Sequence, residues 1–331
     1  MAATIKDVAK KAGVGTGTVS RVLNGGNQVD ATTQKVVLEA IDELNYVPNV
    51  MGKRLRTNRT KVIALMVPII AHPFFSRLAG YIEDEADRFG YSVLLISSQQ
   101  RVGKENEIIN RIRRKEVDGA IFVTHFTHSE EELKDLAIVS IDRHLGKEIP
   151  FVASDNYEAT RKAIEYLIAQ GCKKIGYIGT KPFVDSEVLL REKAYLDCME
   201  EHGMEKFITN EVVLHGEEEK VVEDFIAKHR GVDGIFASGY TLSLTAYNYL
   251  AKRGIRIPDE IQMVSYDGDF RDFDVGPRLT CVEQPIEAMG RQAVRLLMDK
   301  FEKRKVRIEN IIPSEFIPGE TTGNLTLKDL K

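Results

Sequence analysis

The chain contains few of the residues that build disulfide or zinc scaffolds. Its 331 residues include only three cysteines, an odd number without any Cys-x-x-Cys pair: Cys172, Cys198 and Cys281. This usage fits a reducing compartment and argues against a disulfide-stapled fold or a structural zinc site. We therefore expect a cytoplasmic location.

Long apolar runs are also missing. The run KVIALMVPII is interrupted by Pro68 and is followed by His72-Pro73, which makes it too short to span a bilayer. The first residues, MAATIKDVAKKAGVG, are charged from Lys6 onward and lack the apolar segment of a signal peptide. Neither membrane insertion nor secretion is expected.

The usual motifs of catalysis are absent. No Ser-His-Asp order, metalloprotease motif or phosphate-binding loop occurs. His125 and His128 have a spacing that suits a metal, but no third ligand is near in sequence, so we interpret them as part of a loop or cleft rim. The run Glu217–Glu219 is interpreted as a solvated helix start. We expect no enzymatic activity, no metal and no cofactor.

Positive charge is concentrated at the N-terminal end. Residues 1–61 hold ten Lys and Arg against five Asp and Glu, a net charge of +5, so the remainder carries −9 of the total of −4. A basic end on an acidic body is typical of a protein that binds a polyanion at that end. Charge alone leaves chance clustering open.

Three short segments of this basic end have helical spacing. The first helix begins after Thr4, with Asp7 reaching back to the cap, and ends at Gly13-Val14-Gly15. The second begins at Thr16 or Thr18 and ends at Asn24-Gly25-Gly26, and the third begins after Asp30, a good N-cap residue. Two short helices around a glycine turn, braced by a third, predict a helix-turn-helix unit.

In such a unit the second helix lies in the DNA major groove and presents its early exposed positions to the bases. Those positions here are Thr16, Gly17, Ser20 and Arg21. A bidentate contact from Arg21 to guanine would contribute about 1–3 kcal/mol of discrimination between bases. A helical bundle that binds protein is the alternative interpretation.

The segments TIKDVAKKAGVGTGTVSRVLNG and YVPNVMGKRLRTNRT resemble the head signature and the hinge of the LacI/GalR family of bacterial repressors. Weaker similarity runs through the whole chain. The resemblance implies that Leu55, on a hinge helix paired with that of a second subunit, is wedged between base steps in the minor groove. Gly15 replaces the family's usual serine, and Gly17 has no side chain, which shifts base reading to its neighbours. The predicted DNA-binding residues are Thr4, Thr16, Gly17, Thr18, Ser20, Arg21, Asn24, Arg54 and Leu55.

From Lys61 onward, apolar runs alternate with amphipathic helices. VIALMVP, SVLLIS, GAIFV and IVSID are predicted as buried strands, with helices at 74–90 and 104–115. KIGYIG, GIFAS and IQMVSY form a second series, with helices near 157–170, 187–202, 217–229 and 241–253. This alternation predicts parallel sheets covered on both faces, in two similar subdomains.

The last part of the chain is predicted to return between the subdomains. A helix from Pro285 to about Lys303 and the strand IENIIP return to the first one, and SEFIPGETTG crosses back. This interleaving is implied by resemblance to periplasmic-binding-protein-like bodies. The predicted fold is thus an all-α helix-turn-helix head on an α/β body of two parallel-sheet subdomains. Its parts are the head (1–48), the hinge helix and linker (49–60), the N-terminal subdomain (61–156 and 286–314) and the C-terminal subdomain (157–285 and 315–331).

Ligands of open α/β sheets bind beyond the carboxyl ends of the strands, and polar and aromatic residues collect there in this sequence. By motif match, the family's effector contacts fall on Phe74, Phe75, Asp142, Asp155, Arg191 and Asp267. Gly239-Tyr240 stands where relatives commonly carry an Asn-Asp or Ser-Asp pair, and Tyr240 would stack on the ligand instead. Some of these residues also have a structural interpretation, Phe74 and Phe75 as core at a helix start and Asp142 and Asp155 as caps of helices or turns.

These features predict a homodimeric, sequence-specific DNA-binding regulator, in the first instance a repressor. Its partners would be a palindromic double-stranded operator and a small effector, a sugar or a sugar phosphate. Two alternatives stay open. One is a cytoplasmic sugar-binding or sugar-processing protein whose head does not function, and the other is a regulator that uses a purine corepressor or a protein cofactor.

Overall fold

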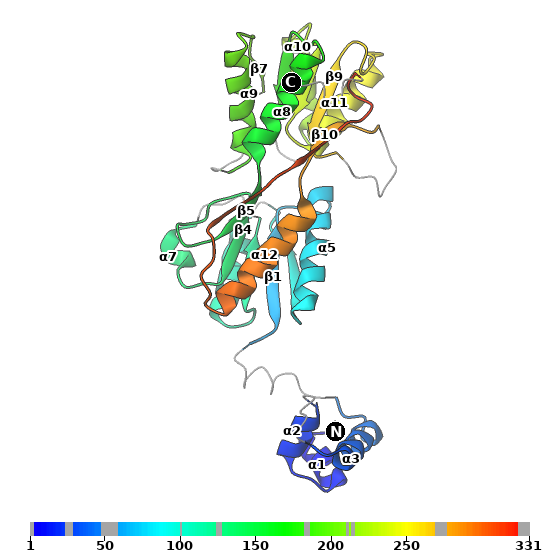
Figure 1. The fold of residues 1–331 in the computed structure, drawn as a ribbon, viewed down its shortest axis with the longest axis vertical. Helices are drawn as coiled ribbons and strands as arrows, with labels where there is room; N and C mark the ends of the chain where they lie inside the picture. Colours follow the sequence, from blue (N-terminus) through cyan, green and yellow to red (C-terminus); the bar gives the residue numbers. More distant parts are fainter. Residues whose placement is uncertain are drawn as a thin grey trace. The chain divides into compact units, whose positions relative to one another are not determined.

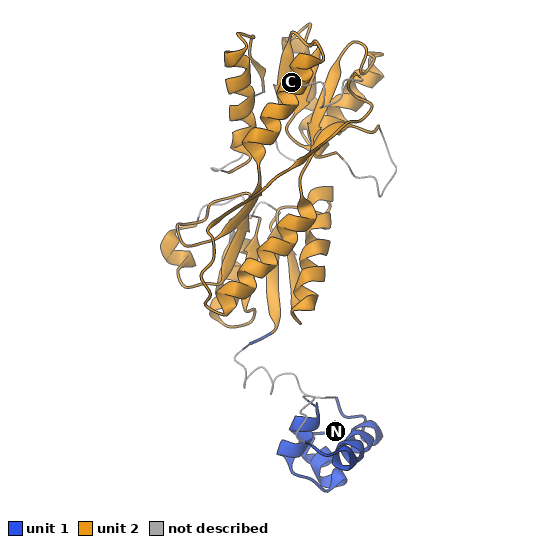
Figure 2. Ribbon diagram, viewed as in Figure 1, with its two compact units in different colours: residues 1–60 blue, residues 61–331 orange. Residues whose placement is uncertain are grey.

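The structure is a computed structural model, and it divides into two compact units, residues 1–60 and 61–331 (Figure 2). It describes residues 3–23, 29–47, 59–99, 101–123, 128–181, 186–209, 212, 216–268 and 277–323. None of the helices in these ranges is long and apolar enough to cross a membrane.

The first unit is the predicted three-helix head, with α1 at Ile5–Ala12, α2 at Thr16–Leu23 and α3 at Ala31–Glu43 (Figure 1). Its centre is a triad of fully buried valines, one from each helix: Val8, Val19 and Val37. Gly13 ends α1 in the left-handed region at φ +66°, a conformation that costs glycine nothing. The helix-turn-helix geometry thus follows from a tight turn and one small core.

Both predicted caps in the head are present. The Asp7 carboxylate accepts the Thr4 N–H at 2.8 Å and the Thr4 hydroxyl at 2.7 Å. The Asp30 carboxylate accepts the Thr33 N–H at 2.9 Å at the start of α3. These hydrogen bonds satisfy backbone donors that have no partner within the helix, and they lower the pKa of both carboxyls.

The second unit contains two six-stranded sheets. The first has the strand order β11-β5-β4-β3-β1-β2, and its pairs are all parallel. Its strands are β1 (Val62–Val67), β2 (Ser92–Ser97), β3 (Gly119–Phe122), β4 (Ile138–Ile141), β5 (Phe151–Ser154) and β11 (Glu309–Ile312). Its helices are α5 (Pro73–Arg88), α6 (Val102–Arg113), the short α7 (Glu130–Leu133) and α12 (Ile286–Phe301).

The second sheet has the order β12-β10-β9-β8-β6-β7, parallel except that β12 is antiparallel to β10. Its strands are β6 (Ile175–Ile178), β7 (Phe207–Ile208), β8 (Gly234–Ala237), β9 (Gln262–Tyr266), β10 (Thr280–Glu283) and β12 (Glu315–Ile317). Its helices are α8 (Asn156–Ala169), α9 (Leu189–Glu201), α10 (Glu218–Lys228) and α11 (Tyr240–Lys252). We call the two sheets with their helices the first and second lobes.

The chain passes between the lobes three times, after β5, after β10 and between β11 and β12 (Figure 1). The predicted architecture of alternating strands and helices in two sheets is confirmed. One element prediction is wrong, because SVLLIS forms β2 but none of its residues is buried, and Leu95 is 37% exposed. The reason is position, since β2 is the edge strand of the first sheet.

Within the first lobe, α5 and α12 are joined by a buried carboxylate. Glu85 on α5 is 2% exposed, and its side chain meets Arg88 at 3.0 Å, Arg291 at 3.3 Å and Arg295 at 2.7 Å. Burial alone would raise the pKa of Glu85, but the three arginines hold it below its usual value. An ionised carboxylate at this place therefore stabilises the helix pair.

Replacing Glu85 with glutamine should destabilise the body by about 3 kcal/mol in urea unfolding at pH 7, because three cations lose their shared partner. The folded pKa of Glu85 is depressed, so its contribution is present above the usual 4.5 and is lost as the pH falls through the folded value. The deficit of E85Q should therefore shrink on acidification. The exposed Glu83 on the same helix gives the matched control, E83Q, which should unfold like the unchanged protein. A deficit that is the same at pH 7 and at pH 3 would contradict this role.

Candidate functional site

The outer face of α2 carries the residues predicted to read DNA. Val19 and Val22 point into the head core, whereas Thr16, Gly17 and Arg21 are exposed and Thr18 and Ser20 are half-exposed. Positions 16, 17, 20 and 21 adjoin one another on a helix of 3.6 residues per turn. A Cβ added at Gly17 would meet no atom within 4 Å, so the surface there is open backbone.

The other predicted DNA contacts do not lie on α2. Thr4 lies at the start of α1, where its hydroxyl is engaged by Asp7. Asn24, Arg54 and Leu55 lie outside the described residues. The described part of the surface is thus α2 itself, with hydroxyls and one guanidinium on a single face.

In the body, Arg191 holds a central place among the predicted effector residues. It lies in the first turn of α9, is only 5% exposed, and donates to Asn156 Oδ1 at 2.6 Å and to the Ser238 carbonyl at 2.7 Å. Its guanidinium carbon stacks 3.4 Å from the centre of the Tyr266 ring. Hydrogen bonds and stacking together fix the plane of the guanidinium fork.

Two carboxylates act on this arginine from the ends of strands in different lobes. Asp142 follows β4 and Asp267 follows β9, and both have a left-handed backbone, with φ of +58° and +62°. Such a conformation is uncommon for residues other than glycine and collects at functional sites. Burial raises the pKa of Asp142 to about 7, and it also raises the pKa of Asp267, in both cases against the opposing charge of Arg191.

The two carboxylates differ in how they are satisfied. Asp267 is 5% exposed and accepts the Gln284 side-chain N–H at 2.8 Å. Asp142 Oδ1 is shielded from solvent, and no donor among the described residues reaches it. A buried acceptor without a partner is costly and is an open position for a ligand hydroxyl.

The two phenylalanines lie at the start of α5, beyond the carboxyl end of β1. Phe74 is 5% exposed and belongs to the core of the first lobe, while Phe75 is half-buried and packs edge-on against it at 5.3 Å. Of the two, Phe75 is the ring with surface left for a ligand.

Asp155 and Tyr240 occupy the ends of other strands. Asp155 follows β5, and its Oδ1 accepts the Ser314 N–H at 2.7 Å in the segment that crosses from β11 to β12. Tyr240 is half-buried at the first position of α11, and burial raises its pKa. The structure thus places Asp142, Arg191 and Asp267 within mutual electrostatic reach, and it ties Asp155 to the crossover between the lobes.

Several residues of this region were not predicted from the sequence. Gln284 follows β10 and joins the lobes, because its Oε1 accepts the Ser154 hydroxyl at 3.0 Å while its amide donates to Asp267. The Tyr266 hydroxyl lies 3.0 Å from the same serine. Their position at the end of a strand is the signal that could have identified them. Gln284 was missed because β10, the strand before it, was not predicted.

Further contacts join the lobes beside these residues. The Asp142 carbonyl accepts the Ser186 hydroxyl at 2.8 Å and the Glu187 N–H at 3.1 Å, and Arg77 on α5 meets Glu283 at 3.4 Å. Atoms of both lobes therefore converge around the candidate cleft, so a change in the lobe angle would alter it.

One minor interpretation is corrected in part. His128 lies in a loop, as expected, but it is buried rather than at a rim, with Nε2 2.7 Å from Glu105 Oε2. The partner lies 23 positions earlier on α6, which no local pattern could indicate. His125 lies outside the described residues.

Comparison with known proteins agrees with this architecture. Residues 4–49 match the family model described as bacterial regulatory proteins, lacI family, and residues 164–322 match that of a periplasmic binding protein-like domain. The ribose operon repressor of Halalkalibacterium halodurans is 36% identical over 96% of this chain and 97% of its own length.

Two solved structures have the same fold. A lac repressor dimer bound to operator and the anti-inducer ONPF superposes with a TM-score of 0.85 at 21% identity, covering 97% of this chain and 99% of that one. A periplasmic binding protein/LacI transcriptional regulator from Alkaliphilus metalliredigens, complexed with D-xylulofuranose, gives 0.70 at 29% identity, covering 80% and 100%. The chain belongs to the LacI family of bacterial regulatory proteins and is a ligand-regulated DNA-binding transcriptional regulator rather than an enzyme.

Proposed function

We propose that this regulator is a cytoplasmic homodimeric repressor of a sugar-utilisation operon. We also propose that a small neutral sugar, bound between the lobes, controls its affinity for a palindromic operator. The observation that carries the ligand assignment is the shielded Asp142 Oδ1, which no donor among the described residues reaches, within electrostatic reach of the fixed Arg191 fork. The neighbouring relatives add support, since one is named for a ribose operon and one was crystallised with a ketopentose.

The charges in the cleft favour a neutral polyol over a sugar phosphate. Besides Arg191, the charges that act on Asp142 are the carboxylates of Asp267 and Glu187. A phosphate dianion here would face three carboxylates, whereas sugar hydroxyls can donate to Asp142 and Asp267 and accept from Arg191. Phe75 would stack on the sugar ring, and Tyr240 would close the far side. For Asp155 direct contact stays a prediction, because its Oδ1 already holds Ser314.

DNA would be read by the exposed face of α2, with Thr16, Ser20 and Arg21 towards the bases. The hinge contacts assigned to Arg54 and Leu55 are part of the same proposal. We also propose lobe boundaries at 61–156 with 286–314 and at 157–285 with 315–331, supported by the strand membership of the two sheets. Sugar binding would alter the lobe angle, and coupling of this kind is typically worth about 1–3 kcal/mol.

The test combines DNA binding with a ligand panel on the full chain. We expect salt-dependent binding to duplex DNA that is lost when residues 1–60 are removed. A neutral pentose at about 100 times its Kd should stabilise the body by about 2.7 kcal/mol and raise its melting temperature by several degrees. Stabilisation by ribose 5-phosphate but not by ribose would overturn the charge assignment if R191A removes that stabilisation. The proposal that the protein is a dimeric repressor would be overturned if it were a monomer and its DNA binding did not depend on residues 1–60.

A further inference from the structure

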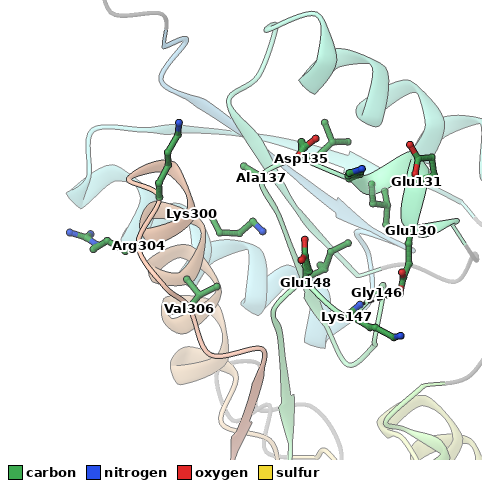
Figure 3. Close-up of a pocket in the computed structure, with 15 residues that line it drawn as sticks. Glu130, Glu131, Asp135, Ala137, Gly146, Lys147, Glu148, Lys300, Arg304 and Val306 are labelled. Carbon is green, nitrogen blue, oxygen red and sulfur yellow. Dashed lines mark hydrogen bonds between the residues drawn. The ribbon is translucent and has the colours of Figure 1, made fainter.

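A second pocket lies in the first lobe, away from the strand ends that form the cleft. It has a volume of about 650 Å³ and is bounded by α7, the segments that precede β4 and β5, and the C-terminal end of α12 (Figure 3). These segments precede strands of the first sheet, so the pocket opens at the amino edge of that sheet, whereas Asp142 lies at its carboxyl edge. Its volume is in the range of small-molecule sites.

The walls of this pocket suit an organic anion. Leu136, Ala137 and Val306 give it apolar surface, and Lys300 and Lys303 line it from the end of α12. Lys300 is half-buried, and no ion pair within the described ranges includes it. Burial lowers the pKa of Lys300, and the charge of Glu148, which lines the same pocket, opposes this shift without an ion pair between the two.

The acidic residues of the pocket do not neutralise Lys300. Glu130, Glu131, Asp135 and Glu148 all line the pocket, but all four are exposed, so water screens their charges. Arg304 is already paired, with Asp299 at 2.8 Å and with Glu302 at 2.5 Å. The largest gain for a ligand is therefore a charge-assisted hydrogen bond to Lys300.

The pocket wall is connected by direct contacts to the point where the chain enters the body. Phe301, next to Lys300, stacks on Tyr91 with ring centres 5.4 Å apart. The Lys61 ammonium lies 4.1 Å from the centre of the Tyr91 ring, and the Lys61 N–H donates to Asp118 at 3.0 Å. Phe301 is also held tightly, because a Cβ on Gly119 would lie 2.9 Å from its ring.

We infer that this pocket is a second effector site, which binds a small organic anion through Lys300 and Lys303 and transmits its occupancy through Phe301 and Tyr91 to Lys61. The ligand carries a phosphate or carboxylate group on a body that covers the apolar floor. The site is separate from the sugar cleft and does not depend on the function proposed for that cleft.

The test uses the full chain with R191A as background, so that binding in the sugar cleft does not contribute. Titration calorimetry with ribose 5-phosphate, pyrophosphate and citrate distinguishes phosphate from carboxylate ligands, with ribose as the neutral control. At least one anion should bind, and K300M should weaken it about tenfold or more, the effect of one charge-assisted hydrogen bond. K305M, an exposed neighbour that does not line the pocket, should bind like the background.

Hydrogen exchange tests the connection to Lys61. Anion binding should slow exchange several-fold in peptides covering 300–306 and 61–63, and Y91L should abolish the second effect while leaving the affinity intact. The second site is overturned if no anion of the panel binds at millimolar concentration or if K300M binds as well as K305M. Unchanged exchange at 61–63 in the bound state overturns the connection. Neither outcome bears on sugar binding, which is measured in the chain with Arg191 intact.

Discussion

Alanine in place of Arg191 should abolish the sugar response while leaving DNA binding intact. The guanidinium is almost fully buried and is the cation that opposes the carboxylates of Asp142 and Asp267. Its loss removes the donors to the sugar, and it removes the charge that opposes the rise in the pKa of both buried carboxyls. Truncating one member of a buried charged set costs about 3 kcal/mol, so the sugar affinity should fall by about 100-fold.

Two matched variants separate the role of Arg191 from a general loss of structure. R191K keeps the charge but loses the planar fork that stacks on Tyr266, so we expect most of the affinity to be lost. K193A, on the exposed side of the same helix, should respond to sugar like the unchanged protein. Calorimetry gives the affinity, and DNA binding with and without sugar gives the response. Full induction of R191A would place the effector elsewhere.

The head could be predicted almost completely from the sequence because its determinants are local. Asp7, Gly13 and Asp30 act within three or four residues of the helix ends that they define. The buried valines follow helical spacing, so the remaining positions of α2 could be inferred to form its exposed face. The hinge residues Arg54 and Leu55 were assigned by family resemblance alone.

The alternation of strands and helices in the body could be predicted, but the short strands and the contacts that connect the two lobes could not. The helix expected near 157–170 is α8 at 156–169, because a long amphipathic segment has a clear period. β5 and β10 have four residues each and carry no such period. Missing β10 meant missing Gln284, which joins Asp267 to Ser154 across the lobes.

The pattern of strand ends nevertheless selected residues that the fold brings near one another. Asp142, Arg191 and Asp267 are 125 positions apart at the extremes, and the fold brings their charges together at the carboxyl ends of strands from two different sheets. The sequence could not show which carboxylate oxygens already accept a hydrogen bond from the protein. Asp155 is engaged by Ser314, 159 positions later in a segment that crosses between the lobes, whereas Asp142 Oδ1 has no donor among the described residues.

Alanine in place of Arg21 should have the largest effect on operator recognition. Arg21 is exposed on α2 beside Thr16 and Gly17, and Gly17 offers no side chain, so the guanidinium is the main group on that face able to read guanine. Loss of one bidentate contact costs about 1–3 kcal/mol, and a dimer loses two, so specific affinity should fall by about 30-fold at least. The measurement is a titration of the natural operator by fluorescence anisotropy at several salt concentrations.

Nonspecific binding is the internal control for this variant. Binding to random duplex depends on phosphate contacts and falls with salt. R21A should therefore lose only the contribution that one positive charge per head makes to the affinity for random DNA. R21K keeps that charge but lacks the fork, so it should bind random DNA normally while losing most of the preference for operator. If R21K retained full preference, or if R21A lost specific and random binding equally, Arg21 would be a phosphate contact. Base reading would then rest on Thr16 and Ser20, whose hydroxyls reach fewer base atoms, and the specificity of this head would have to come mainly from the shape of the DNA.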